Sequence, residues 1–251
     1  MSKESQVTHP VLSLKNVCVG YAGVYVAQNV DFNIHKGDCF GLVGVNGAGK
    51  TSLIKALIGL REQDEGEISI FGQTRLNDEV KRDFGYLPER FEPPWFLKGE
   101  EFIKFTMSLY ERTYDQEKLL AYCNDILLDP ECLTRRITTY SKGMRQKLGL
   151  IATLMSGVDL LILDEPMSGL DPLARVSVKN LLKRANAEGR TIFLSSHILA
   201  DIDDLCSHMA VLDDTKIQFY GSPQELKSRY GLDSLENAFL HLVRPEMMQA
   251  A

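Results

Sequence analysis

The sequence predicts an α/β protein with a helical insert. Short apolar runs separated by turns fill the first third of the chain, and the same strand–helix alternation returns in the last third. Between them, residues 89–157 carry apolar side chains at three- and four-residue intervals, which is typical of amphipathic helices. Strands and helices on both sides of a helical block favour one α/β core interrupted by a helical subdomain.

The individual elements follow in order along the chain. Expected strands are short apolar runs bounded by turn residues, and expected helices show helical spacing or a capping residue followed by proline. The strands are expected at residues 11–19, 26–34, 39–43, 67–71, 84–87, 160–163, 191–195, 209–212 and 217–219, and the helices at 50–60, 100–111, 116–127, 144–155, 172–189 and after Ser222-Pro223. We expect one domain over residues 1–251, with the α/β core at 11–88 and 158–225, the helical subdomain at 89–157 and a tail at 226–251.

The composition excludes several classes of protein. Apolar residues make up 44% and charged residues 25% of the 251 residues, so the chain can bury an ordinary core. The net charge is −6 and the basic residues are scattered, which disfavours nucleic acid or anionic lipid as a partner. The cysteines are odd in number and form no CxxC pair, so we expect reduced thiols in a cytosolic protein. They are Cys18, Cys39, Cys123, Cys132 and Cys206.

Two further absences in the sequence concern membranes. Residues 1–10 lack an apolar segment, so we expect no signal peptide. No run of about 18 apolar residues occurs, so we expect no membrane span. Any membrane role would therefore depend on another chain.

The strongest motif is Gly44-Val-Asn-Gly-Ala-Gly-Lys50-Thr51, which fits the phosphate-loop pattern G-x-x-x-x-G-K-[ST]. It follows an expected strand and opens an expected helix, where backbone N–H groups of residues 46–51 can point at phosphate oxygens. Lys50 would reach the β- and γ-phosphates, and the Thr51 hydroxyl would bind Mg²⁺. The alternative, a glycine-rich turn with an exposed lysine, is disfavoured by the strand–loop–helix context.

The second motif is Leu160-Leu-Ile-Leu163-Asp164-Glu165, an apolar strand that ends in two carboxylates. Ligands bind at this end of the strands in open α/β sheets. Asp164 would hold Mg²⁺, and Glu165 would orient or deprotonate the attacking water. A solvated strand end would be the better interpretation if the phosphate loop were absent.

The third motif is Tyr140-Ser141-Lys142-Gly143-Met144, which comes directly before an apolar helix. Ser141 is a good N-cap residue, and a helix N-terminus with a free hydroxyl can bind an anion. Here the sequence resembles the ABC-transporter ATPases, whose signature is usually written LSGGQ. Without the other motifs, an ordinary capped helix would be the preferred interpretation.

The resemblance extends over nearly the whole chain. Ser168–Asp171 is similar to the D-loop, Tyr86–Glu89 occupies the Q-loop position, and Asp171 is expected to contact the other subunit of a dimer. His197 is similar to the switch histidine that senses the γ-phosphate, although a lone histidine after a strand is more often structural. Tyr21 matches the aromatic that stacks on adenine, with a core aromatic as the alternative. The resemblance implies a P-loop NTPase (RecA-like) core with an N-terminal antiparallel β-region and a helical insert.

The implied site combines these motifs. It has catalytic Glu165, His197 and Lys50, and metal ligands Thr51, Glu89 and Asp164. The ATP-binding residues are Tyr21, Gly44, Asn46, Gly47, Ala48, Gly49, Lys50, Thr51, Ser52, Ser141, Lys142 and Gly143.

Four positions depart from the family pattern. Glu89 replaces the usual glutamine; it can still ligate Mg²⁺ but adds negative charge near the phosphates. Lys142 and Met144 replace glycine and glutamine, and Lys142 could either add a cation near the phosphate or point to solvent. Tyr140 replaces leucine, where we expect it to pack.

The resemblance also implies a function. It predicts Mg²⁺-dependent ATP hydrolysis by a head-to-tail homodimer, at the cytoplasmic face of the inner membrane, for a separately encoded export permease. Residues 89–157, including the aromatic–proline segment at 93–96, are the expected docking surface, with local packing as the alternative for that segment. The tail carries an apolar stripe of Leu235, Phe239 and Leu242 that we expect to pack on its own domain. A non-transport ATPase and a regulatory ATP-binding module are the alternatives.

Overall fold

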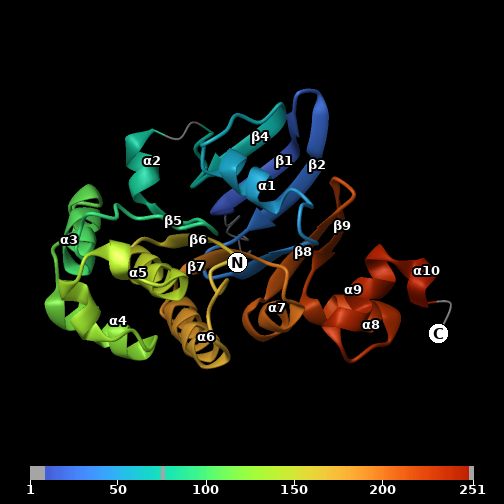
Figure 1. Ribbon diagram of the computed structural model, residues 1–251. Helices are drawn as coiled ribbons and strands as arrows, with labels where there is room; N and C mark the ends of the chain where they lie inside the picture. The colour runs from blue at the N-terminus through green and yellow to red at the C-terminus, as the bar shows by residue number, and fades with distance from the viewer. Residues whose placement is uncertain (1–8, 75–76, 249–251) are drawn as a thin grey trace, which may run out of the picture.

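The computed structural model describes residues 9–74 and 77–248 and contains two β-sheets flanked by helices (Figure 1). The strands are β1 Leu12–Tyr21, β2 Val24–Ile34, β3 Cys39–Val43, β4 Glu65–Ile70, β5 Phe84–Leu87, β6 Leu160–Asp164, β7 Thr191–Ser196, β8 His208–Asp213 and β9 Lys216–Gly221. The helices are α1 Lys50–Leu57, α2 Asp78–Arg82, α3 Gly99–Leu109, α4 Gln116–Asp125, α5 Lys142–Met155, α6 Pro172–Ala187, α7 Leu199–Leu205, α8 Pro223–Tyr230, α9 Leu235–Val243 and α10 Pro245–Met248. The predicted fold class is confirmed.

The larger sheet has the strand order β5-β6-β7-β3-β8-β9. All neighbouring pairs are parallel except β8 and β9, which form an antiparallel edge. In register, Asp164 of β6 lies opposite Ser195 of β7, and Ser196 lies opposite Val43 of β3. The carboxyl ends of these three strands therefore meet at one edge of the sheet, where α/β folds bind ligands.

The smaller sheet has the order β2-β1-β4, and both pairs are antiparallel. Its apolar side chains belong to the same buried cluster as one face of the larger sheet. Phe32 of β2 stacks on Phe40 of β3 at a centroid distance of 5.0 Å, and Phe40 stacks on Phe193 of β7 at 5.8 Å. The antiparallel region thus shares its core with the parallel sheet rather than burying one of its own.

Helices α3, α4 and α5 gather beside the β5 end of the larger sheet (Figure 1). Their buried residues, such as Ile103, Cys123 and Ile151, belong to one apolar cluster with Leu161 and Leu194 of the sheet. The helical insert is therefore joined to the core by continuous packing. That packing fixes the start of α5 relative to β6.

Several element boundaries differ from the predictions. Helix α1 ends at Leu57 rather than residue 60, because Gly59 adopts a φ of 72° and Leu60 is left 68% exposed. Helix α5 begins at Lys142, two residues earlier than predicted, because Ser141 caps it. The sequence patterns did not reveal α2, α7 and α10, which have five, seven and four residues.

The tail prediction is confirmed. Leu235 and Phe239 of α9 are buried in the main apolar cluster, and Leu242 packs against it. All five cysteines are buried free thiols. The expectation that the chain has no signal peptide concerns residues 1–10. Residues 1–8 of that segment lie outside the described residues. Within the described residues, no helix combines the length and apolar character needed to span a bilayer.

Candidate functional site

The phosphate loop connects β3 to α1 and depends on two glycines. Gly47 and Gly49 have φ values of 84° and 103°, in the left-handed region that other residues rarely adopt. A Cβ atom on Gly49 would lie 2.5 Å from the Val26 carbonyl oxygen, whereas one on Gly47 would meet no described atom within 4 Å. The backbone is therefore closely packed against Val26 at Gly49, whereas no described atom fills the space beside Gly47, and a phosphate could approach there.

The start of α1 offers hydrogen-bond donors. Gly49 caps the helix without a side chain, so the first-turn N–H groups have no side-chain acceptor and no intrahelical partner. The helix dipole adds partial positive charge at this end. One loop donor is already used, because the Ala48 N–H donates to the Val45 carbonyl at 3.1 Å.

Lys50 is buried at the centre of the site, with 7% of its surface exposed. Its amine donates to the carbonyl oxygens of Gly44 at 2.7 Å and Val45 at 3.3 Å, and lies 3.8 Å from Glu165 Oε1. Burial lowers the pKa of the Lys50 amine, and the nearby carboxylates of Glu165, Asp164 and Glu89 oppose this shift. The loop and the carboxylates therefore face each other across one space.

Asp164 ends β6 and is fully buried. Its Oδ1 accepts a hydrogen bond of 2.5 Å from the Ser195 hydroxyl, whereas Oδ2 is buried with no hydrogen-bond partner among the described residues. A buried carboxylate oxygen without a partner is costly unless another group binds it. This orphaned oxygen fits a divalent cation such as Mg²⁺.

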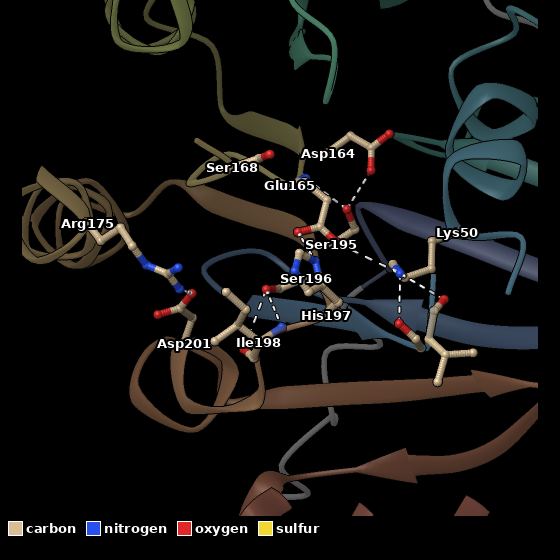
Figure 2. A network of polar contacts seen from close by, with 12 residues as sticks. Lys50, Asp164, Glu165, Ser168, Arg175, Ser195, Ser196, His197, Ile198 and Asp201 are labelled. Carbon is tan, nitrogen blue, oxygen red and sulfur yellow. Dashed lines mark hydrogen bonds and ion pairs between the residues drawn. The ribbon is translucent and has the colours of Figure 1, made fainter. Parts of the chain in front are cut away.

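Glu165 follows directly and is held from two sides (Figure 2). Its backbone N–H donates to Ser195 Oγ at 2.9 Å, and its Oε2 lies 2.9 Å from His197 Nδ1. Its φ of 49° is left-handed, a conformation that costs about 1–2 kcal/mol for a residue with a Cβ atom. The surrounding contacts fix this strained geometry and keep the carboxylate 3.8 Å from the Lys50 amine.

A cavity of about 280 Å³ lies between the loop and the carboxylates. Its lining brings together many of the predicted site residues, including Glu89 from the segment after β5. They are Asn46, Gly47, Gly49, Lys50, Thr51, Ser52, Glu89 and Glu165, with Val26 beside them. In the described residues, no three His, Cys, Asp or Glu side chains are close enough to hold a metal alone. A Mg²⁺ ion here would be coordinated by phosphate oxygens as well as by protein side chains, as is usual for Mg²⁺ in nucleotide sites.

The predicted base-stacking residue Tyr21 lies at the end of β1 and is 46% exposed, so it is not a core aromatic. Its hydroxyl donates to Ser52 Oγ at 3.2 Å, next to the phosphate loop. The Arg61 guanidinium lies 3.9 Å from the Tyr21 ring centroid. Arg61 was not predicted, and its position after a helix end gave no signal.

The signature residues lie elsewhere on the chain. Ser141 is exposed, and its Oγ accepts the Met144 N–H at 3.2 Å, which confirms the predicted N-cap. Lys142 is also exposed and reaches Ser168 Oγ at 3.3 Å. Lys142 lines a separate cavity of about 380 Å³, and among the described lining residues the two cavities share Glu89 alone. Within one chain, the structure therefore does not bring Ser141, Lys142 and Gly143 into the phosphate cavity.

The predicted packing of Tyr140 and the predicted N-cap at Asp171 are confirmed, whereas the contact of Asp171 with another subunit stays a prediction. Tyr140 is buried, and its hydroxyl donates to the Cys132 carbonyl at 2.7 Å. Asp171 caps α6 by accepting the Ala174 N–H at 2.9 Å.

Sequence reasoning missed Ser195, which contacts both Asp164 and Glu165. A signal was present, since two serines end an otherwise apolar strand. Hydroxyls buried at the carboxyl end of a central strand need partners, and that is the end where functional groups gather.

These features define a class of protein. The site has a strand–loop–helix whose first helical N–H groups are free, a buried lysine, and two carboxylates at the edge of a parallel sheet. This combination is the site of a P-loop nucleotide-binding ATPase.

Comparison with known proteins gives the family. The ABC transporter family matches residues 27–168. An uncharacterised ABC transporter ATP-binding protein of Synechocystis sp. is 36% identical over 77% of this chain and 55% of its own length. Nod factor export ATP-binding protein I of Cupriavidus metallidurans is 33% identical over 90% of this chain and 76% of its own length. The chain thus spans little more than half of the first curated relative it matches.

Solved structures agree. An ATP-binding subunit of an ABC transporter superposes with a TM-score of 0.84 and 30% identity, covering 92% of this chain and 99% of the other. A dimeric ATP-binding cassette bound to ADP and Pi shares the fold, with a TM-score of 0.76, 22% identity, and coverage of 84% and 98%. The chain belongs to the family of ABC transporter ATP-binding proteins and carries its ATPase domain.

Proposed function

We propose that this chain hydrolyses ATP with Mg²⁺ to energise a membrane permease encoded as a separate chain. One observation carries the proposal: Lys50 and Glu165 line the same phosphate cavity with their charged groups 3.8 Å apart, and the preceding Asp164 keeps a buried oxygen that has no partner among the described residues. A cation, a base and a phosphate loop at one point are the parts that phosphoryl transfer to water requires.

Each side chain has a role in this proposal. The α1 N–H groups and Lys50 bind the phosphates, while Thr51, Asp164 and Glu89 hold Mg²⁺. Bound Mg²⁺ neutralises the charge that develops on the phosphate oxygens. Glu165 accepts a proton from the attacking water. His197, at 2.9 Å, orients that carboxylate.

The second half of the site comes from another copy of the chain in this proposal. Ser141 caps α5 on the surface, where a partner's γ-phosphate can reach it. A related cassette of the same fold is a dimer bound to ADP and Pi, which supports a head-to-tail homodimer closing over two ATP molecules. Tyr21 would stack on adenine, and Asp171 would contact the partner.

Exposed aromatic residues support a permease docking surface on the insert. Trp95 and Phe96 are 67% and 57% exposed and their rings contact each other edge to face at a centroid distance of 5.8 Å, so they form an exposed apolar pair. The relative named for Nod factor export supports an export role for this chain. We propose that it binds peripherally at the cytoplasmic face of the inner membrane. Copurification of an integral membrane protein that is lost in Trp95→Ala would test this surface.

Two other functions are less well supported. A non-transport ATPase acting on nucleic acid would need a basic surface, and the chain has a net charge of −6. A regulatory module that binds ATP without hydrolysing it would not need Glu165 beside the cavity.

The replacement Glu165→Gln tests the catalytic assignment, because it keeps the shape and removes the base. We expect turnover to fall by about 10²–10⁴-fold, the usual contribution of a general base, while ATP still binds and a closed dimer accumulates. Phosphate release, ATP titration and sedimentation measure these quantities. Glu188→Gln, at the exposed end of α6, is the matched control. Unchanged hydrolysis in Glu165→Gln would refute the role of Glu165.

A further inference from the structure

One buried hydroxyl joins the two carboxylate residues of the site. Ser195 Oγ donates to Asp164 Oδ1 at 2.5 Å and accepts the Glu165 backbone N–H at 2.9 Å (Figure 2). Ser195 and Asp164 are both fully buried, so bulk water cannot take the place of either bond. A hydroxyl can do both because it carries one donor and two acceptor lone pairs.

We propose that Ser195 is a positioning residue for the metal: its hydroxyl turns Asp164 so that Oδ2 is presented to Mg²⁺, and it fixes the Glu165 backbone. The inference rests on the proposed Mg²⁺–ATP site.

The geometry of Asp164 supports this role. A carboxylate can rotate and offer either oxygen, or both, to a cation. Here the Ser195 hydrogen bond occupies Oδ1 and leaves Oδ2 as the buried oxygen without a partner. Hydrogen bonds from outside the coordination sphere orient metal ligands in this way in many metal sites.

The geometry of Glu165 supports it as well. Glu165 has a left-handed φ of 49°, which needs an external contact to persist. Its N–H is the group nearest to the strained bond, and Ser195 accepts it. The same hydroxyl therefore sets the direction of Asp164 and the backbone of Glu165.

The neighbouring serine shows that a bridging role is not a default. Ser196 Oγ accepts the Ile198 N–H at 3.0 Å and donates to the Ile198 carbonyl at 3.4 Å, so its hydrogen bonds to described residues stay within its own turn. Ser195, one residue earlier, instead reaches across to β6. A serine that only satisfied itself would have bonded locally.

The test measures metal binding without turnover. The purified chain is loaded with a non-hydrolysable ATP analogue and titrated with Mn²⁺. The concentration of unbound Mn²⁺ is followed by its electron paramagnetic resonance signal. We expect Ser195→Ala to weaken Mn²⁺ binding by about 10–100-fold, the usual effect of losing such a supporting hydrogen bond. Binding of the analogue in EDTA should change by less than about twofold, since Lys50 and the loop are untouched.

Two further variants keep the test decisive. Thr191→Val removes a buried hydroxyl at the other end of β7, where Thr191 Oγ1 accepts the Gly37 N–H at 3.0 Å; it should leave Mn²⁺ affinity unchanged. Ser195→Cys preserves the side-chain shape with a weaker donor, and it should show an intermediate loss even if the alanine variant does not fold.

The outcomes are separable. Wild-type Mn²⁺ affinity in the folded alanine variant, or in the cysteine variant, would overturn the role of Ser195 alone. Failure of the wild-type chain to bind Mn²⁺ with the analogue would instead remove the proposed Mg²⁺–ATP site, and this inference with it.

Discussion

The starts of α1 and α5 are both candidate anion sites, but they are built differently. Helix α1 is capped by Gly49, which has no side chain, so its first-turn donors stay available. Helix α5 is capped by Ser141, whose hydroxyl already accepts one of the helix's own N–H groups. The cap of α1 leaves the first N–H groups of that helix free to bind a ligand, whereas the cap of α5 already accepts one of the first N–H groups of its helix.

Their surroundings differ in the same sense. The start of α1 faces a cavity walled by carboxylates of its own chain, with Lys50 7% exposed. The start of α5 is on the surface, beside the exposed Lys142. The start of α1 can bind a phosphate within a single chain. The start of α5 can act only on a group brought by another molecule, and the experiments below separate the two.

The largest expected effect is at α1. Lys50→Met keeps the volume and removes the charge, and we expect ATP affinity to fall by about 10–100-fold. Hydrogen bonds to charged groups contribute about 1.5–3 kcal/mol, and each 1.4 kcal/mol is tenfold. Calorimetric titration with ATP measures the loss. Lys55→Met, exposed on the same helix, is the control and should bind as the wild type. Equal affinity in both variants would contradict the importance of α1.

An intermediate effect is expected at α5, on dimer formation alone. Ser141→Asp and Ser141→Asn both supply a good N-cap, so helix stability should be nearly equal. The aspartate adds a negative charge that would face the partner's phosphate, so we expect ATP-dependent dimers to weaken about tenfold or more relative to asparagine. Sedimentation in the Glu165→Gln background measures this. Identical dimerisation by the two variants would mean that no phosphate reaches Ser141.

The smallest effect is expected at Glu89, which lines both cavities. Glu89→Gln should fold and bind ATP within about threefold of the wild type, because one charge near the phosphates is lost while an oxygen ligand remains. The Mg²⁺ concentration needed for half-maximal hydrolysis should rise a few-fold. Glu92→Gln, whose exposed partner is Arg90 at 2.7 Å, is the control. Loss of ATP binding in Glu89→Gln would show that the residue has another role.

The fold could be predicted wherever the local pattern of apolar residues matches the burial of those residues in the structure. The strand at residues 84–87 was predicted with its observed bounds, because a short apolar run is buried there on both sides. Helix α1 was predicted too long, since Ile58 and Leu60 continue the helical spacing while the Gly59 backbone ends the helix. Helix α7 was missed because its seven residues include three aspartates, one of which, Asp201, is buried against Arg175.

The site could be predicted along the chain but not across it. The spacing around Lys50 and the strand end at Asp164 identified groups that the structure does bring together. The bridge from Ser195 to Asp164 depends on the parallel register of β6 and β7, which no local pattern encodes. The separation of Ser141 from the phosphate cavity likewise depends on how the insert packs, not on the motif.

The shared aromatic core has a consequence for biosynthesis. Phe32 packs in one stack with Phe193, so the strands made first cannot complete their core until β7 has left the ribosome. At about 5–20 residues per second, this delay is on the order of ten to thirty seconds. For that interval the apolar face of β1 and β2 has no native partner from β7. Slower translation between these segments would lengthen the period in which a nascent chain is vulnerable to misassociation and depends on chaperones.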